Sequence, residues 1–195
     1  FGGSETGDAV ADVLFGKITP SGKLTTTFPR SVGQLPLFYN HLNTGRPDPD
    51  SHIFNRYASN YLDESNEPLY PFGYGLSYTD FVYGELQISS ETLPKNGELT
   101  VSVTVTNKGN YDGYETVQLY LHDIYAEIAR PVKELKGFER VFLKSGESRD
   151  VKFVITEDDL KFYNSELHYV YEPGEFDVMV GPNSRDVQTK SFQAK

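Results

Sequence analysis

Hydrophobic and polar residues alternate along most of the chain from about residue 81 onward. Leucine and valine alternate with threonine and serine over residues 99–106, and the same period of two returns at 117–121, 151–155 and 176–180. A period of two is typical of a strand with one buried face. Seven or eight such segments lie between residues 81 and 195, and no long helix interrupts them. The pattern predicts an antiparallel β-sandwich.

One short helix is predicted inside this region. Residues 157–163 follow Thr156, a preferred N-cap residue, and Asp159 stands three positions after it. A hydroxyl at the N-cap and an acidic residue three positions later can satisfy each other's backbone N–H groups. We therefore expect a single helical turn between two strands.

The beginning of the chain follows a helical period instead. An apolar stripe at the spacing of a helix is formed by Ala9, Val10, Val13 and Leu14. It predicts a helix over residues 4–16. Ser4 or Thr6 is the expected N-cap, and Gly16 is the expected stop at the C-terminal end. Glu5 and Asp8 stand where the helix dipole favours negative charge.

A short strand is predicted over residues 24–28, where Leu24, Thr26 and Phe28 alternate before a proline. A helix and a strand alone cannot bury the apolar stripe, so residues 1–30 are expected to be the remnant of an α/β domain. The chain also begins at Phe1 without methionine or a signal-like apolar run. We therefore expect that further sequence precedes it in a longer polypeptide.

Residues 31–80 show neither period. Proline, glycine, asparagine and aspartate interrupt this stretch repeatedly, and nine of its residues are phenylalanine or tyrosine. Long loops within compact proteins are usually functional or disordered. The aromatic content argues against disorder, so this segment is expected to be a connection that packs across neighbouring domains.

Composition excludes several kinds of function. The 195 residues carry a net charge of −10, which disfavours nucleic acid as a partner. There is no cysteine, so disulfides, thiolate metal sites and cysteine nucleophiles are excluded. No apolar stretch is long enough to span a membrane. The four histidines, His41, His52, His122 and His168, lack the spacing of a zinc site, and no metal is expected.

Two segments carry a specific resemblance to a known family. The first is GDAVADVLFG at residues 7–16, followed by PSGKL at 20–24 and TFP at 27–29, and the second is PLYPFGYGLSYT at 68–79. In this order they resemble the C-terminal part of glycoside hydrolase family 3, where an α/β sandwich domain is followed by a fibronectin type III-like domain. The resemblance continues to the end of the chain.

The resemblance implies a mainly β fold in three parts. Residues 1–30 would be the C-terminal remnant of the α/β sandwich domain, and residues 31–80 the long aromatic-rich connection. Residues 81–195 would form an antiparallel β-sandwich of the fibronectin type III or immunoglobulin-like kind. For the longer protein, the family also implies export to the periplasm or the exterior.

The same resemblance implies a retaining β-glycosidase, such as a β-glucosidase or β-xylosidase. Family members carry an Asp nucleophile on an N-terminal barrel and usually a Glu acid/base on the α/β sandwich domain, and this chain matches neither motif. Retaining hydrolysis requires two carboxylates about 5–5.5 Å apart. The chain is thus expected to contain no catalytic residue and no cofactor, to be inactive alone, and to brace the upstream barrel and α/β sandwich domains.

Four residues are candidates for contact with the sugar substrate. Glu5 matches the carboxylate of a family motif near the active site, although the proline of that motif is absent here, and a Glu that stabilises a helix N-terminus is the simpler interpretation. Tyr57, Asn60 and Tyr61 would contact the substrate if the connection reaches over the pocket of the intact enzyme and shapes the subsite of the leaving group. The neighbouring acidic residues at 63–67 are interpreted as solvated loop residues.

Two further interpretations are left open. Tyrosines on the sandwich, namely Tyr111, Tyr114, Tyr120 and Tyr125, could form a sugar-stacking face or cover the edge of the core. The whole chain could alternatively be a free-standing carbohydrate-binding or adhesion module. Residues 4–29 discriminate against that alternative, because an autonomous sandwich has no use for an isolated helix and strand with an apolar stripe.

Overall fold

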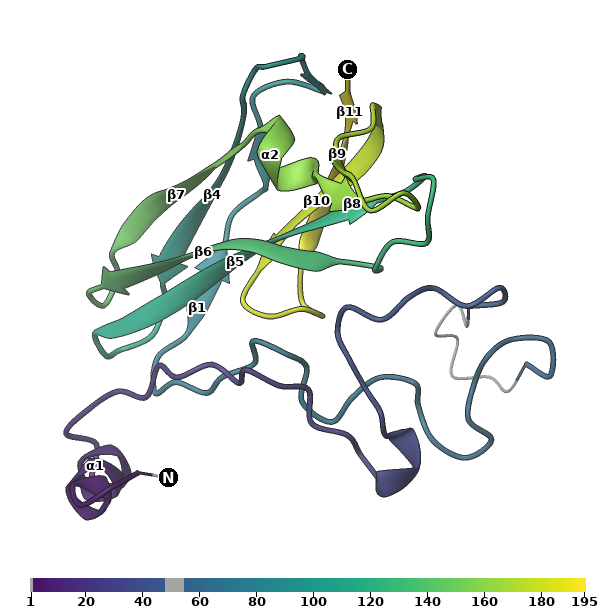
Figure 1. Ribbon diagram of the computed structural model, residues 1–195. Coiled ribbons are helices and arrows are strands. Elements are labelled where there is room, and N and C mark those ends of the chain that lie inside the picture. Colours follow the sequence, from purple (N-terminus) through teal and green to yellow (C-terminus); the bar gives the residue numbers. More distant parts are fainter. Residues whose placement is uncertain (1, 48–54) are drawn as a thin grey trace.

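The computed structural model describes residues 2–47 and 55–195, and it confirms the predicted β-sandwich (Figure 1). One sheet contains β1 (Phe81–Tyr83), β2 (Gln87–Ile88), β4 (Leu99–Asn107) and β7 (Ser148–Ile155). Here β4 is central, because it pairs with β1 and β2 along one edge and with β7 along the other, always antiparallel.

The second sheet has the strand order β3-β11-β10-β5-β6. Its strands are β3 (Thr92–Leu93), β5 (Gly113–Asp123), β6 (Glu134–Leu143), β10 (Gly174–Gly181) and β11 (Gln188–Ala194). All its pairs are antiparallel except β3 with β11, which is parallel. The prediction of an antiparallel sandwich is therefore confirmed with one parallel edge strand.

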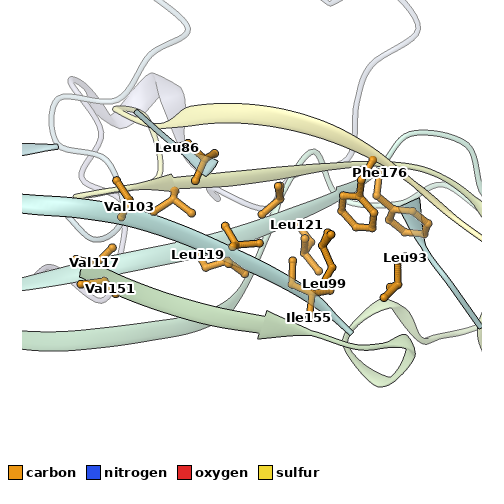
Figure 2. Packing of buried hydrophobic residues seen from close by; sticks show 14 of the residues in the cluster. Leu86, Leu93, Leu99, Val103, Val117, Leu119, Leu121, Val151, Ile155 and Phe176 are labelled. Atoms are coloured by element: carbon orange, nitrogen blue, oxygen red, sulfur yellow. The ribbon is translucent and has the colours of Figure 1, made fainter. Parts of the chain in front are cut away.

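The core lies between the two sheets and contains the predicted inward-facing residues (Figure 2). On β4 the valines at 101, 103 and 105 are buried, while Ser102 and Thr104 between them are more exposed. Opposite them, Val117, Leu119 and Leu121 of β5 are buried as well. Alternation in the sequence thus identified the inner face of both sheets, because successive side chains of a strand point to opposite faces.

Four very short strands were not predicted. They are β2, β3, β8 (Phe162–Tyr163) and β9 (Tyr169–Val170), and β8 pairs with β9 in a separate hairpin. The predicted helical turn is confirmed as α2 (Glu157–Leu160), where the carboxylate of Asp159 accepts hydrogen bonds from the backbone N–H and hydroxyl of Thr156. It ends earlier than predicted, because the chain enters β8.

The predicted N-terminal helix is confirmed as α1 (Thr6–Leu14). Neither Ser4 nor Thr6 caps it: Glu5 is the N-cap residue, and the hydroxyl of Thr6 donates to the carbonyl of Gly3 instead. Gly16 follows the helix with a φ of 72°, as predicted for a C-terminal stop. None of the helices within the described ranges is long and apolar enough to cross a membrane.

The prediction of a regular strand over residues 24–28 is wrong. This segment is extended, and Leu24 and Phe28 exchange backbone hydrogen bonds with the segment 70–74, but only Phe28 and Tyr70 form a β-bridge. The partner segment contains Pro71, which has no N–H to donate, and Gly73 with a φ of 78°. Such a partner cannot continue a ladder, so the pairing remains interrupted.

The connection packs across the outer face of β5. It contains one short 3-10 helix, η1 (Val32–Gln34). Residues 117–121 of β5 are all buried, so the strand is covered on both faces. Core residues cover its inner face, and the connection covers its outer face near Gln118 and Tyr120. Figure 1 shows this connection running along one side of the sandwich from α1 to the opposite end.

Candidate functional site

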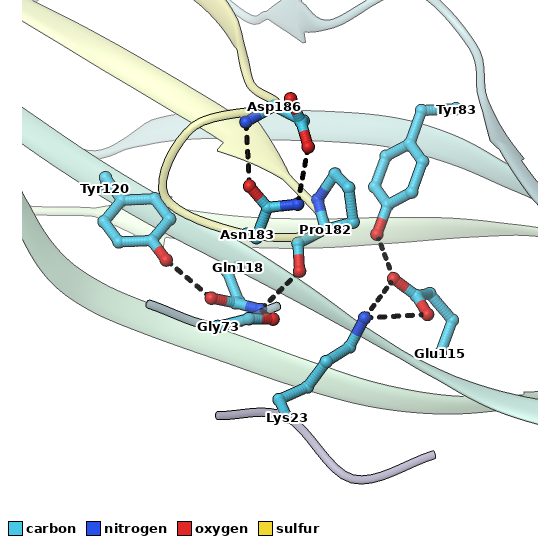
Figure 3. Close-up of polar contacts among 9 residues, drawn as sticks. All are labelled: Lys23, Gly73, Tyr83, Glu115, Gln118, Tyr120, Pro182, Asn183 and Asp186. Carbon is cyan, nitrogen blue, oxygen red and sulfur yellow. Dashed lines mark hydrogen bonds and ion pairs between the residues drawn. The ribbon is translucent and has the colours of Figure 1, made fainter. Parts of the chain in front are cut away.

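Gln118 joins three segments on the outer face of β5 (Figure 3). Its amide nitrogen donates to the carbonyl of Gly73 at 3.1 Å and to that of Pro182 at 2.6 Å, and its amide oxygen accepts from the hydroxyl of Tyr120 at 2.5 Å. Gln118 is buried, so each of these bonds replaces contact with water. The side chain thus fixes the connection to the sandwich and to the turn before β11.

Aromatic rings surround this contact. The ring of Tyr39 stacks on Phe72 with centroids 4.3 Å apart and meets the edge of Tyr120 at 5.9 Å. The backbone N–H of Ser184 donates to the carbonyl of Phe72 at 2.9 Å. Burial raises the pKa of Tyr120, and the neighbouring Tyr39 adds to this effect. The interpretation of Tyr120 as a residue of an exposed sugar-stacking face is therefore wrong, because the connection covers it.

A buried ion pair attaches the first segment to the sandwich. The amine of Lys23 lies 3.1 and 3.2 Å from the two carboxylate oxygens of Glu115, which also accepts from the hydroxyl of Tyr83 at 2.8 Å (Figure 3). The side chains of Lys23 and Glu115 are only 17% and 6% exposed. Burial raises the pKa of Tyr83, and the charge of Glu115 raises it further.

Two adjoining hollows form a groove along the connection, which we call the connection groove. One, of about 380 Å³, lies between the connection and the sandwich, and the other, of about 470 Å³, lies within the connection itself. They share the lining residues Leu37, Phe38, His41 and Asn66. The ring of Phe38 is 61% exposed there. An aromatic face beside a few polar groups is the usual chemistry of a small-molecule site.

The sandwich contributes charged groups to this groove. Lys133 and Arg185 line the hollow of about 380 Å³ between the connection and the sandwich, together with Glu67 of the connection. Arg185 is held by the carboxylate of Asp186 at 3.1 Å, which raises the pKa of the guanidinium. Glu67 is the one acidic residue among the described residues that line the groove. Because double displacement at a sugar requires two carboxylates, the groove offers binding groups but no such pair.

The structure brings together two of the four sequence-predicted contact residues. Asn60 and Tyr61 both line the connection groove, and the amide of Asn60 also donates to the carbonyl of Asn55 at 3.1 Å. Tyr57 is 66% exposed and lies beside the guanidinium of Arg56, away from the groove lining. Glu5 is the exposed N-cap residue of α1 and lines neither hollow of the groove.

Metal ligation finds no support in the geometry. Within residues 2–47 and 55–195, no three His, Asp or Glu side chains gather in a way that could hold a metal ion. His41 lines the connection groove, whereas His122 lies 3.8 Å from Asp177 on the sandwich. His52 lies outside the described residues.

Sequence reasoning did not find Phe38, Lys133 or Gln118 as functional residues. Phe38 is one of many aromatic residues in a stretch without a period, and nothing local distinguishes it. Lys133 stands between Val132 and Glu134 at the start of a strand, where an exposed lysine is ordinary. The sequence carries one signal, at β5. Alternation assigns Tyr120 to the outer face of this strand, and a large aromatic residue there indicates that the outer face is covered.

Comparison with known proteins gives matches along the chain. A model of the glycosyl hydrolase family 3 C-terminal domain matches residues 1–78, and a model of the fibronectin type III-like domain matches residues 115–184. A periplasmic β-glucosidase of Salmonella typhimurium is 52% identical over 99% of the chain, and a putative β-xylosidase of Formosa agariphila is 44% identical over 98%.

The solved structures agree with these matches. The crystal structure of a β-glucosidase from Listeria innocua is 47% identical and superposes with a TM-score of 0.90 over 98% of the chain. The chain spans about a quarter of the length of these proteins, namely 25%, 24% and 26%. The chain therefore belongs to glycoside hydrolase family 3, in which it combines a stretch of the C-terminal domain with the fibronectin type III-like domain.

Proposed function

We propose that the longer protein containing this chain is a retaining β-glycosidase that hydrolyses β-glucosides or related sugars. Relatives of both β-glucosidase and β-xylosidase kind match the chain over nearly its whole length, and these names support the class of reaction. The nucleophile and the acid/base would be carboxylates of the upstream barrel and α/β sandwich domains, about 5–5.5 Å apart. This chain supplies neither of them, and the reaction uses water and no cofactor.

The role of this chain in that protein is to brace the catalytic domains. The observation that carries this proposal is the exposed apolar face of α1, on which Val10 is 50%, Leu14 72% and Phe15 88% exposed. The C-terminal end of the helix is attached to the connection, because the hydroxyl of Tyr78 donates to the carbonyl of Val13 at 2.7 Å. The exposed face is then the surface on which the upstream domains pack.

This proposal divides the chain at the predicted boundaries. Residues 1–30 complete the α/β sandwich domain, residues 31–80 connect, and residues 81–195 form the brace. The contacts of Lys23 with Glu115 and of Gly73 with Gln118 support a division in which all three parts act as one body. The alternative of a free-standing carbohydrate-binding or adhesion module is not favoured, since relatives match residues 1–30 together with the sandwich.

The connection groove is proposed to adjoin the leaving-group side of the substrate pocket. Asn60 and Tyr61 are the residues expected to contact the sugar there, whereas Tyr57 and Glu5 lie outside the groove. The aromatic ring of Phe38 offers a face for stacking, and the amides of Asn60 and Asn66 offer hydrogen bonds to hydroxyl groups. Export to the periplasm is likewise a proposal, supported by the name of the Salmonella relative.

An activity assay tests the hydrolase proposal. The 195-residue chain alone is expected to release no product above a blank from an aryl β-glucoside, and the longer protein is expected to hydrolyse it with retention at the anomeric carbon. Hydrolysis by the purified chain would refute the assignment of both carboxylates to upstream domains. Inversion by the longer protein would refute the double-displacement mechanism.

The groove proposal has its own test in the longer protein. Tyr61→Ala is expected to raise KM for disaccharides several-fold while leaving KM for β-glucosyl fluoride nearly unchanged, because the leaving group of a disaccharide contacts the groove and fluoride is too small to reach it. Tyr163→Ala is the matched control, since Tyr163 is an exposed tyrosine of the separate β8–β9 hairpin. Equal effects of the two variants would refute a role for the groove in substrate binding.

A further inference from the structure

Lys133 lies where the sandwich meets the connection groove. The backbone preceding it is fixed, because the N–H of Val132 donates to the carbonyl of His41 at 2.9 Å. Its side chain lines the hollow between the connection and the sandwich, and its amine donates to the carbonyl of Ser184 at 2.7 Å. The amine is therefore held at the wall of a cavity of about 380 Å³ instead of extending into solvent.

The surroundings of this amine favour its neutral form. Burial lowers the pKa of Lys133 below the ordinary value for lysine, and the nearby carboxylate of Glu67 opposes part of this effect. The other titratable or charged residues that line the same hollow are Tyr39, His41 and Arg185. A neutral amine can donate a hydrogen bond to the Ser184 carbonyl and still keep its lone pair, whereas an ammonium group has no lone pair. Lysines in such a setting are the ones that serve as nucleophiles.

We propose that Lys133 is a covalent attachment site for small aldehydes, and in particular for the open-chain form of an aldose that enters the connection groove. The amine nitrogen attacks the carbonyl carbon, and a carbon–nitrogen bond forms. The carbonyl oxygen leaves as water with the two protons of the amine, so that an imine remains and no oxidant or reductant is consumed. Pockets of a few hundred Å³ accommodate ligands of this size.

The aldose is the part of the inference that rests on the proposed function. Hydrolysis of a glycoside releases a reducing sugar, whose open-chain form is an aldehyde, beside the groove in which the amine lies. The reactivity of the amine itself depends only on the geometry of this chain. The two parts can therefore be tested separately with the 195-residue chain, which is not expected to hydrolyse glycosides.

Reductive trapping measures the reactivity of the amine. The chain is treated with a limiting amount of glyceraldehyde and cyanoborohydride at neutral pH, and adducts are located by peptide mass mapping. Lys133 is expected to react several-fold faster than the exposed Lys95 and Lys108, since each unit of pKa lowering raises the neutral fraction about tenfold. Labelling of Lys133 no faster than these two lysines would overturn the proposal.

Two variants and a second aldehyde sharpen the test. Glu67→Gln removes a negative charge that favours the ammonium form, so the rate at Lys133 is expected to rise, and an unchanged or lower rate would count against the proposal. Lys133→Arg is expected to abolish the adduct on that peptide alone. D-glucose replaces glyceraldehyde in a parallel reaction, and reaction of Lys133 with glyceraldehyde but not with glucose would overturn the aldose assignment.

Discussion

The attachment of the connection to the sandwich can be tested at Gly73. This residue has a φ of 78°, and a Cβ added to it would lie 2.0 Å from the side-chain oxygen of Gln118. Gly146 provides a matched control, because its φ is 77° and nothing lies within 4 Å of the position of its Cβ. The variants Gly73→Ala and Gly146→Ala therefore share the same backbone cost and differ in the contact with Gln118.

The expected magnitudes follow from these two positions. Alanine in the left-handed region costs about 1–2 kcal/mol, and this is the whole expected effect of Gly146→Ala. In Gly73→Ala the amide of Gln118 must also move, which leaves the buried carbonyl of Gly73 and the partly buried carbonyl of Pro182 without their donor. A buried group that loses its partner costs about 1–3 kcal/mol. We expect a total of about 3–5 kcal/mol for Gly73→Ala after partial relaxation.

Urea unfolding followed by tyrosine fluorescence measures both changes, since the chain contains 14 tyrosines and no tryptophan. The double variant Gly73→Ala with Gln118→Ala removes the side chain that the new methyl group would meet. Its destabilisation is expected to be smaller than the sum of the two single effects by about 1–2 kcal/mol. Equal destabilisation by Gly73→Ala and Gly146→Ala would refute the conclusion that Gln118 fixes the connection.

Two further predictions concern buried charges. Lys23→Met leaves the carboxylate of Glu115 buried without its cation, so it is expected to reduce the free energy of unfolding by about 3–5 kcal/mol, measured by urea unfolding. Lys17→Met is the control, because Lys17 is 72% exposed in its pair with Asp12 and should cost at most about 1 kcal/mol. Burial raises the pKa of Asp123 above its usual 3.8, so folding favours the protonated acid. This preference stabilises the folded state at low pH, and the stabilisation is lost as the pH rises through the folded-state pKa. Asp123→Asn is therefore expected to gain stability relative to the original chain as the pH rises above about 4, and thermal unfolding at several pH values that showed the opposite trend would contradict this sign.

The sandwich was predictable because its signal is local. Along β4 the alternation of valine with threonine identifies the buried face without knowledge of any other segment. The same holds for α2, where Thr156 and Asp159 are three positions apart and satisfy each other. Two-residue strands such as β3 carry no such signal, because a period needs several residues to be visible and their pairing is decided by the partner strand.

The connection groove was not predictable for the opposite reason. Phe38 and Lys133 meet in it although they are far apart in the chain, and the hydroxyl of Tyr39 accepts from the backbone of Leu135 across 96 positions. Hydrophobic periodicity describes the face that a segment presents, not the segment that will cover it. For the same reason alternation predicts a regular strand over residues 24–28, although the partner segment contains Pro71 and cannot continue a ladder.

The contacts between the three parts of the chain differ in how much they stabilise their arrangement, and this difference bears on the proposed bracing role. The exposed bond from Arg140 to the hydroxyl of Ser21 can exchange with water and contributes little. The buried pair of Lys23 and Glu115 is different, because either charge alone would be enclosed without compensation. Gln118 fixes the connection in the same way. Since both buried contacts lie between the sandwich and the segments that lead to α1, the exposed apolar face of α1 has a defined direction relative to the sandwich. A brace requires such a direction, because a flexibly tethered module could not position the domains that pack on it.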